Sequence, residues 1–256
     1  MGQVATTKSF ESLHDAYAFF QDHSTEADAD LEGYLPYLRT LARPGRPGRL
    51  LDFGCGDGVF SGRLLERAGL DPARLELSLV EPDPGYRGEA VARLQAFCRP
   101  PVAAWPEFPD DGAGPFDLIL SNHALYYVPD LAGTLARLLE RLAPGGLLLT
   151  AMGDGGNIFA QWVDRVYAAL GEVPPHYRSE DLEAALTGLG RTWRQERIDY
   201  VLDFPDNPDN RIKILRFMLG ETYARLDRNW LLTLFDAQAA DGRVTARTHH
   251  YHYVSG

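Results

Sequence analysis

A short apolar segment that runs into a glycine-rich turn constrains this chain more than any other feature. The segment Leu50–Phe53 is followed by glycine at every second position, Gly54, Gly56 and Gly58. Glycine has no Cβ, so the backbone can turn sharply there and a ligand can approach the main chain closely. The sequence therefore predicts a buried strand followed by a ligand-binding loop; the alternative is a tight turn that binds nothing.

The residues around this turn favour a cationic ligand over a pyrophosphate. The dinucleotide-binding fingerprint needs glycine at its first, third and sixth positions, and here the sixth position is Val59. Two carboxylates, Asp52 and Asp57, flank the turn and would repel phosphate. A dehydrogenase that uses a nicotinamide dinucleotide therefore ranks last among the candidate functions.

The composition is that of a globular protein with an acidic balance. The 256 residues carry a formal net charge of −11, with 45% apolar and 24% charged residues. An acidic protein is repelled by the phosphates of DNA and RNA, so nucleic acid is not an expected partner. Two cysteines are too few for a disulfide framework. No stretch approaches the roughly 20 apolar residues that span a bilayer, so we expect a cytoplasmic protein without a membrane partner, and a monomer is compatible with the sequence.

From residue 49 onward, short apolar segments alternate with segments of helical periodicity. Such alternation predicts an α/β fold with a mostly parallel sheet and helices on both faces. Ligands of these sheets bind at the carboxyl ends of the strands, where Asp52, Glu81, Asn122 and His123 fall. The expected strands are 49–53, 75–81, 102–105, 116–121 and 147–152, and the expected helices are 59–68, 86–97 and 130–142.

The two ends of the chain follow other patterns. Apolar spacing over residues 9–41 predicts two helices with an interruption near His23–Glu26. After residue 151 we expect helices over 158–170 and 180–189, a strand over 194–202, a helical insertion beginning near 211, and a closing strand over 244–254. The sequence contains no internal repeat.

Three motifs in register resemble the class I S-adenosylmethionine-dependent methyltransferases: the glycine turn, Pro115–His123, and Leu142–Leu149. The resemblance implies a Rossmann-like, seven-stranded, mostly parallel sheet and S-adenosyl-L-methionine as cofactor. It also implies that Glu81 binds the ribose hydroxyls. The segment Leu125–Asp130 resembles the small-molecule branch of that superfamily. The cofactor-binding residues implied are Asp52, Gly54, Gly56, Glu81, Pro82, Tyr86, Asn122 and His123.

Phe19–Glu26 and the Leu-Tyr-Tyr-Val run after residue 124 are similar to segments of the histamine N-methyltransferase family. This resemblance implies that Glu26 binds substrate, that residues 1–48 form a helical substrate lid, and that residues 49–256 form the methyltransferase domain with a helical insertion at about 205–232. His123 stands where that family has a glutamine, Asn157 replaces a tryptophan, and Thr248 matches an asparagine. The aromatic faces of Tyr17, Phe20 and Tyr127 could stabilise a cationic group. The candidate substrate-binding residues are Tyr17, Phe20, Glu26, His123, Tyr127, Thr248 and His250.

An amine acceptor adds one chemical demand. It is protonated at neutral pH and must lose a proton before its lone pair can attack, so a carboxylate or imidazole nearby can assist. Glu26 and His123 are the candidate catalytic residues. Plainer interpretations remain: Glu26 can begin a helix after Ser24, and Tyr17 and Phe20 can be ordinary core residues.

The histidines near the end of the chain suggest a metal at first sight. On an alternating strand His250 and His252 share one face while His249 points to the other, and no neighbouring carboxylate or cysteine in the sequence completes a set. We therefore expect no metal, and His250 is a candidate for the substrate pocket.

The sequence predicts an enzyme that transfers a methyl group from S-adenosylmethionine to a small molecule, with an amine or amino-acid-like acceptor. One alternative is an O-methyltransferase of a secondary-metabolite pathway. The other is a cofactor-binding module on the same fold that transfers no methyl group.

Overall fold

The computed structural model describes residues 14–42 and 45–256. The first residues of the predicted amino-terminal helix, 9–13, lie outside this range, as does part of the predicted lid. The chain divides into two compact units, and each is described by itself. Unit 1 comprises the described part of residues 1–29, with 153–176 and 197–250. Unit 2 comprises residues 30–152, 177–196 and 251–256.

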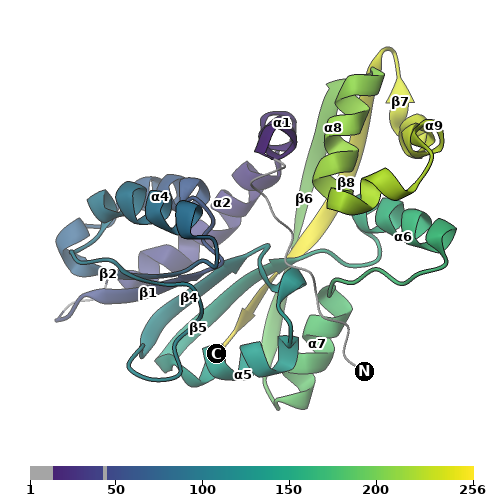
Figure 1. Cartoon of the computed structure of the whole chain (residues 1–256). Coiled ribbons are helices and arrows are strands. Elements are labelled where there is room, and N and C mark those ends of the chain that lie inside the picture. Colours follow the sequence, from purple (N-terminus) through teal and green to yellow (C-terminus); the bar gives the residue numbers. More distant parts are fainter. Residues whose placement is uncertain (1–13, 43–44) are drawn as a thin grey trace. The chain divides into compact units, whose positions relative to one another are not determined.

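The sheet has the strand order β3-β2-β1-β4-β5-β8-β6, and a short strand β7 pairs with β8. In unit 2, neighbouring strands from β3 to β5 are parallel, whereas β8 is antiparallel to β5. Figure 1 shows β1, β2, β4 and β5 side by side. The bounds are β1 Gly48–Phe53, β2 Leu75–Val80, β3 Ala103–Trp105, β4 Phe116–Asn122, β5 Leu142–Met152, β6 Trp193–Pro205, β7 Ala239–Ala240 and β8 Arg243–Ser255.

The order of the strands reverses between β1 and β4. The chain proceeds from β1 outward to β2 and β3, and then returns to place β4 on the other side of β1. At such a reversal the crossover helices leave on opposite faces, which opens a crevice at the carboxyl ends of the two strands. In this chain the corresponding positions are Gly54 directly after β1 and Asn122–His123 at the end of β4.

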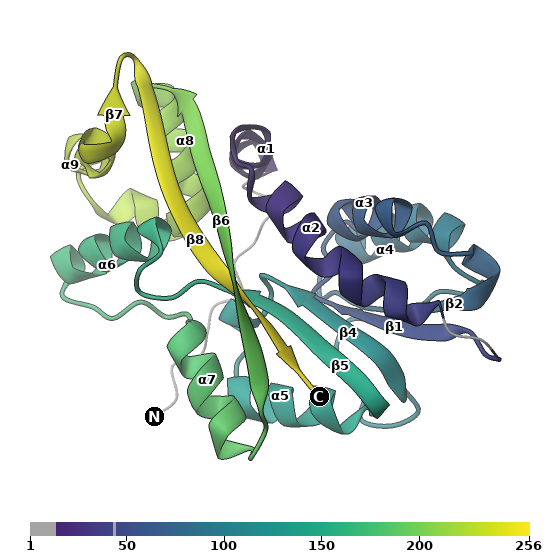
Figure 2. The ribbon, with the colours of Figure 1, turned by 180° about the vertical axis from the view of Figure 1, so that it is seen from behind.

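Alternating side chains of the strands supply two apolar layers in unit 2. Leu50 and Leu120 belong to a buried cluster with α2, α3 and α4, whereas Leu51 and Ile119 belong to a cluster with α5 and α7. Neighbouring strand residues point to opposite faces, so each strand contributes to both layers. Both views show these two sets of helices on opposite faces of the sheet (Figures 1 and 2). The helices are α2 Glu26–Leu38, α3 Val59–Ala68, α4 Pro84–Leu94, α5 Leu131–Glu140 and α7 Ser179–Gly188.

Local capping sets where the helices of unit 2 begin. The carboxylate of Asp83 accepts a hydrogen bond from the Tyr86 amide, and Pro84 occupies the first helical turn. Proline at that position costs no hydrogen bond because the first amides of a helix have no intrahelical partner. Helix α4 therefore begins two residues before the predicted start at 86. Asp130 caps α5 in the same way through the Gly133 amide.

Unit 1 has its own apolar core on the remaining parts of β6 and β8. Phe20 of α1 (His14–His23), Trp162 of α6 (Ile158–Leu170) and Phe204 of β6 are all buried in one cluster. Figure 2 shows α8 and α9 beside the ribbon of β6 and β8. The helices following β6 are α8 Pro208–Leu219 and α9 Arg228–Leu232. The short 3₁₀ helices of the described chain are η2 Arg39–Leu41, η3 Pro72–Arg74, η4 Gln95–Phe97, η5 Leu125–Tyr127, η6 Gly220–Arg225 and η7 Thr233–Gln238.

The predicted α/β fold is confirmed, and three details differ. The sheet has eight strands instead of seven, because the Ala239–Ala240 segment pairs with the start of β8. Strand β6 continues through Phe204, where the sequence suggested a break, because Phe204 packs into the core of unit 1. Strand β5 begins at Leu142 instead of 147, since Leu142 pairs with Phe116 before the register shifts.

The compact units do not follow the predicted division at residues 48 and 49. Most of α2 groups with the sheet, because Leu31, Leu35 and Leu38 are buried in the same cluster as the strands of unit 2. The helical insertion at 208–238 groups instead with α1 and α6. The substrate-lid role of the amino-terminal helices remains a prediction.

Among the helices of the described residues, none has the length and apolar character to cross a membrane.

Candidate cofactor and catalytic site

Two glycines of the turn after β1 have different structural roles. Gly54 has a φ of +77°, and a Cβ built on it would lie 2.3 Å from the Cβ of Ala124. The absence of a side chain therefore lets the segment after β4 approach this turn closely. Gly56 has a φ of +55°, and no atom lies within 4 Å of its built Cβ. Its backbone faces open space that a ligand could fill.

The carboxylate of Glu81 joins the loops that follow β1 and β2. Its Oε2 accepts a hydrogen bond from the Gly56 amide at 3.0 Å, and its Oε1 accepts one from the Asp83 amide at 2.9 Å. Burial raises the pKa of Glu81, and the two backbone hydrogen bonds oppose that rise. The side chain is only half-buried, so an ordered carboxylate remains within reach of a ligand.

The geometry around Glu81 fits the predicted ribose site. An ionised carboxylate can accept about four hydrogen bonds, and two are taken by Gly56 and Asp83. The remaining acceptor positions suit two neighbouring hydroxyl groups. Pro82 is exposed directly after Glu81, and Tyr86 is half-buried in the first turn of α4. Their contact with a cofactor stays a prediction.

Asp52 has a different environment from the one the sequence suggested. It is 3% exposed, and its Oδ2 accepts a short hydrogen bond from the hydroxyl of Ser61 in α3. Burial raises the pKa of Asp52 to about 7, although Ser61 opposes the rise. The carboxylate thus ties β1 to α3 from inside the protein. Its direct contact with a cofactor stays a prediction that this burial does not support.

His123 follows β4 with an uncommon backbone conformation. Its φ is +53°, in the left-handed region that residues other than glycine rarely adopt. Such a conformation costs on the order of 1–3 kcal/mol and persists only where surrounding contacts enforce it. The His123 ring lies parallel to that of Tyr126 with centroids 6.0 Å apart, and its Nδ1 is 3.4 Å from the Tyr126 hydroxyl.

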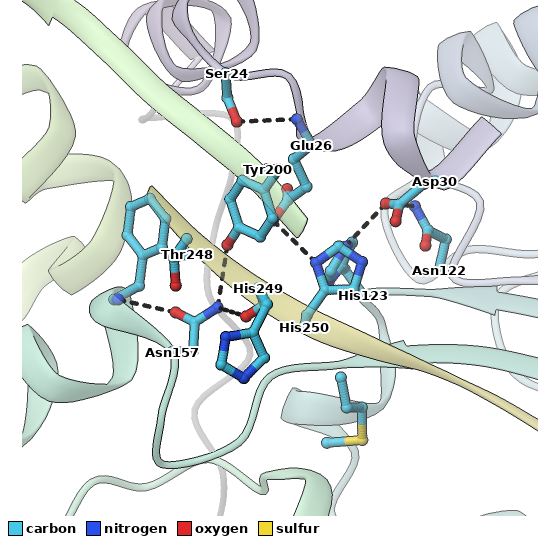
Figure 3. Close-up of polar contacts among 12 residues, drawn as sticks. Ser24, Glu26, Asp30, Asn122, His123, Asn157, Tyr200, Thr248, His249 and His250 are labelled. Carbon is cyan, nitrogen blue, oxygen red and sulfur yellow. Dashed lines mark hydrogen bonds and ion pairs between the residues drawn. The ribbon is translucent and has the colours of Figure 1, made fainter. Parts of the chain in front are cut away.

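A buried carboxylate, Asp30 of α2, lies at the centre of the polar contacts around His123. Asp30 is fully buried. Its Oδ2 is 3.1 Å from Nε2 of His123 and 3.3 Å from Nδ2 of Asn122, and its Oδ1 is 2.7 Å from Nε2 of His252. Figure 3 shows Asp30 beside Asn122 and His123. One carboxylate thus lies within hydrogen-bonding distance of three side chains.

Tyr34, one helical turn after Asp30, completes this cluster. Its ring stacks on His252 with centroids 3.9 Å apart, and its hydroxyl donates to Oδ1 of Asn122 at 3.1 Å. The amide of Asn122 is therefore held at both ends. We call Asp30, Tyr34, Asn122, His123 and His252 the Asp30 cluster. The side chain of Asn122 thus makes its hydrogen bonds within this cluster, and its contact with the cofactor stays a prediction.

In unit 1, two predicted substrate residues lie together. Oε1 of Glu26 is 3.8 Å from Nδ1 of His250, and the His250 ring lies 5.2 Å from that of Tyr200. Glu26 is half-buried at the first residue of α2, where its amide donates to Ser24 Oγ (Figure 3). The helix-start interpretation of this segment is therefore correct, and it does not exclude a role for the carboxylate.

Thr248 and Asn157 form hydrogen bonds that connect elements of unit 1. The Thr248 hydroxyl accepts from the Ile158 amide at 2.9 Å. The Asn157 side chain caps α6, and its Nδ2 donates to the Tyr200 hydroxyl and to the His249 carbonyl (Figure 3). Both residues are buried. Thr248 was predicted to bind substrate, but this burial and its contact with α6 point to a structural role.

The predicted aromatic substrate residues differ in exposure. Phe20 is buried and stacks on Phe217 at 4.4 Å, so it belongs to the core of unit 1. Tyr17 is 38% exposed and also contacts the Phe217 ring, at 5.6 Å. Tyr127 is half-buried in unit 2 with its ring 5.9 Å from Tyr126. The core interpretation holds for Phe20.

Each histidine near the end of the chain has a carboxylate neighbour within its own unit, which the sequence did not indicate. His249 lies 3.4 Å from Asp154, while His250 pairs with Glu26 and His252 with Asp30, as described above. The partners come from distant parts of the chain, so local spacing could not predict them.

Sequence reasoning missed Asp30, Tyr34, His252 and Tyr200. The positions of the first two carried a usable signal. Asp30 and Tyr34 are four residues apart on α2, so both project from one helical face, and Leu31 and Leu38 flank them in a buried stretch. An aspartate on such a face needs partners, because an unpaired buried charge is costly.

A family model described as a methyltransferase domain matches residues 26–195. This match covers both loops at Gly56 and Glu81 and most of the Asp30 cluster. The chain belongs to the methyltransferase domain family. His250 and His252 lie beyond the matched residues.

Curated relatives agree with this family. The chain is 34% identical over 176 residues to the biotin biosynthesis bifunctional protein BioCD of Bordetella avium, covering 66% of this chain and 35% of that protein. It is 35% identical over 140 residues to the trans-aconitate 2-methyltransferase of Methylobacterium nodulans, covering 54% of this chain and 48% of that one. The methyltransferase domain thus spans less than half the length of each of these two relatives.

The fold of this methyltransferase domain also occurs in solved structures. The plantazolicin methyltransferase BpumL in complex with SAH is similar over 96% of this chain and 91% of that one, with a TM-score of 0.53 and 12% identity. At that identity the likeness establishes the fold alone.

Proposed function

We propose that this methyltransferase domain transfers a methyl group from S-adenosylmethionine to a small molecule, and that the acceptor is an amine nitrogen. The observation that carries the first part is the carboxylate of Glu81, which is held by the Gly56 and Asp83 amides at the ends of β1 and β2. It gives the site an ordered acceptor for ribose hydroxyls beside a loop with open space. The complex of BpumL with SAH, a protein that shares the fold, supports the same cofactor.

When bound, S-adenosylmethionine supplies an electrophilic methyl group on a sulfonium centre. The protein then needs to align the acceptor and to exclude water. In unit 2, the carboxylates of Glu81 and Asp30 make the ends of the strands electronegative, which suits a cationic cofactor.

The charges of the cluster also support an amine acceptor. A polycarboxylate such as trans-aconitate would have to approach the carboxylates of Asp30 and Glu81 in a chain of net charge −11. A protonated amine is attracted instead. It must then lose a proton, and His123, whose side chain is one-quarter exposed, can accept it.

Residues of unit 1 support the same acceptor class. Glu26 and Tyr200 both lie beside His250, and a carboxylate with an aromatic ring suits an ammonium group. The resemblance to the histamine N-methyltransferase family at Phe19–Glu26 points in the same direction, while His123 in place of a glutamine argues for a different substrate within that class.

The test incubates the protein with S-adenosylmethionine and a panel of biogenic amines and amino acids. The proposal predicts release of S-adenosylhomocysteine together with a mass gain of one methyl unit on an amine. NMR of the product should place the new methyl on nitrogen. Tight binding of S-adenosylhomocysteine without turnover across a broad panel of acceptors would instead favour a cofactor-binding module.

A second candidate is methyl transfer to a hydroxyl oxygen. The 3.1 Å contact between His123 and Asp30 supports this candidate as well, because a hydroxyl group, like an ammonium group, must give up a proton to a positioned base. A phenol panel run beside the amine panel separates the two. A new methyl on oxygen, with no amine methylated, would replace the nitrogen proposal.

A further inference from the structure

Asp30 has the geometry of a group that acts through an imidazole. We propose that Asp30 is a positioning residue that holds His123 with its proton on Nε2, so that Nδ1 is the atom that accepts a proton from the substrate. This proposal rests on the proposed function for the identity of the proton donor. The ring geometry that it requires does not depend on that function.

The choice of tautomer follows from the carboxylate. An ionised carboxylate only accepts hydrogen bonds, so the imidazole nitrogen that faces it must carry the hydrogen. Nε2 of His123 lies 3.1 Å from Oδ2 of Asp30. In the neutral ring the lone pair is then on Nδ1, which lies 3.4 Å from the Tyr126 hydroxyl.

Asp30 is unusually well fixed for this role. It is fully buried, its other oxygen accepts from His252 at 2.7 Å, and His252 is itself buried and stacked on Tyr34. The amide of Asn122 also donates to Oδ2. A buried carboxylate with these contacts has little freedom to turn away from His123.

The backbone conformation of His123 also supports the conclusion that its ring is held in place. His123 has a φ of +53°, and Gly54 lacks a Cβ at the point where Ala124, the residue after His123, approaches the turn after β1. The close packing of Ala124 against Gly54 therefore helps to fix where the His123 ring begins. Asp30 then fixes how the ring is oriented.

The proton transfer balances within this cluster. The substrate ammonium gives one N–H proton to Nδ1 of His123, and the electron pair of that bond stays on the amine nitrogen. His123 becomes an imidazolium whose Nε2–H still faces Asp30. The charge of Asp30 is then compensated by a neighbouring cation, which favours this protonated state.

The test measures the tautomer directly. Two-bond ¹H–¹⁵N correlation spectra of the full chain, labelled at histidine nitrogens, distinguish Nε2–H from Nδ1–H rings, and His123→Gln assigns the signal of His123. The proposal predicts that both His123 and His252 carry the proton on Nε2 in the wild-type protein. A wild-type His123 with its proton on Nδ1 overturns it. This measurement needs no variant of Asp30 to fold and no turnover.

Asp30→Asn provides the perturbation. An asparagine has one acceptor oxygen and one NH₂ group where Asp30 offers an acceptor to each imidazole. At least one of the two rings must therefore change tautomer, and unchanged signals from both rings would contradict the proposal. Asp154→Asn is the matched control, since Asp154 is likewise a carboxylate beside a histidine, His249. It should leave the signals of His123 and His252 unchanged.

Rates distinguish positioning from stability. Asp30→Asn should lower kcat by on the order of 10²–10⁴-fold, as removal of an orienting carboxylate does elsewhere, with KM within a few-fold. The double variant Asp30→Asn/His123→Gln should be no slower than His123→Gln alone. Multiplicative losses would show that Asp30 does not act through His123. Failure to methylate any acceptor would remove the proposed function while the wild-type spectrum still decides the tautomer.

Discussion

Replacing Glu81 by glutamine tests the cofactor site with the smallest change in shape. Each oxygen of Glu81 already accepts from one backbone amide, which leaves one acceptor position on each for a ribose hydroxyl. A glutamine keeps one oxygen and turns an NH₂ group toward the other amide and hydroxyl. The variant therefore loses about one hydrogen bond to a charged acceptor, worth about 1.5–3 kcal/mol, so Kd should rise about 10- to 150-fold.

The assay is titration calorimetry with S-adenosylhomocysteine, accompanied by thermal unfolding of each protein. Glu76→Gln is the matched control, because Glu76 lies in β2, the strand that Glu81 follows, and its carboxylate forms an exposed 3.4 Å contact with Arg49. Such exposed pairs contribute about 0–1 kcal/mol to stability, and the affinity of this control should be unchanged. Equal affinity of Glu81→Gln and wild type, with both folded, would refute the reasoning, as would an equal loss in the control.

Three further perturbations follow from the structure. Gly54→Ala places a Cβ 2.3 Å from that of Ala124 at a φ of +77° and should lower the free energy of unfolding by about 2–4 kcal/mol. Gly56→Ala should lower it by about 1 kcal/mol and should mainly weaken cofactor binding. Denaturant titration and calorimetry measure the two effects, and equal losses of stability in the two variants would contradict the assignment. Because the pKa of Asp52 is raised to about 7, the folded state between about pH 4 and pH 7 holds a proton that the unfolded state has released. The free energy of unfolding of the wild type should therefore fall by about 4 kcal/mol at most across this range as the pH rises. Asp52→Asn should lack this component, and parallel pH profiles of unfolding for the two proteins would disprove it. Asn157→Ala removes the cap of α6 and the donor to Tyr200, and should lower the free energy of unfolding by about 2–4 kcal/mol; a loss below about 0.5 kcal/mol would show that this network is not structural.

The fold could be predicted because its information is local. Leu50 and Leu51 point to opposite faces of β1, and both are buried, so the strand is a continuous apolar run. The glycine turn and the alternation of elements then set the topology. The errors lie where local chemistry competes, as at Asp83 and Pro84, whose capping geometry begins α4 early.

The candidate site was only partly predictable. Glu81 and Gly56 lie in motifs, and the structure joins them by a hydrogen bond. Asp30 was not identified, because an aspartate in a helix containing other acidic residues looks like part of a solvated face. Its partners are 92 to 222 residues away along the chain. Only the folded arrangement of α2, β4 and β8 brings them together.

For Thr248 the sequence and the structure favour different roles. A match to a related family suggested contact with substrate, but its hydroxyl is committed to the Ile158 amide and is buried. A short hydroxyl on a strand has the same sequence signature whether it binds a ligand or the start of a helix. The hydrogen-bond partner of the hydroxyl distinguishes the two roles, and the sequence alone does not show which residue that partner is.

The most direct test of the account is a crystal structure of the protein with S-adenosylhomocysteine. We predict that both ribose hydroxyls lie within hydrogen-bonding distance, about 2.5–3.0 Å, of the Glu81 carboxylate, with the amino-acid end of the ligand over Gly56. A complex in which the ligand binds elsewhere, or in which Glu81 contacts only the amides of Gly56 and Asp83, would contradict the central claim.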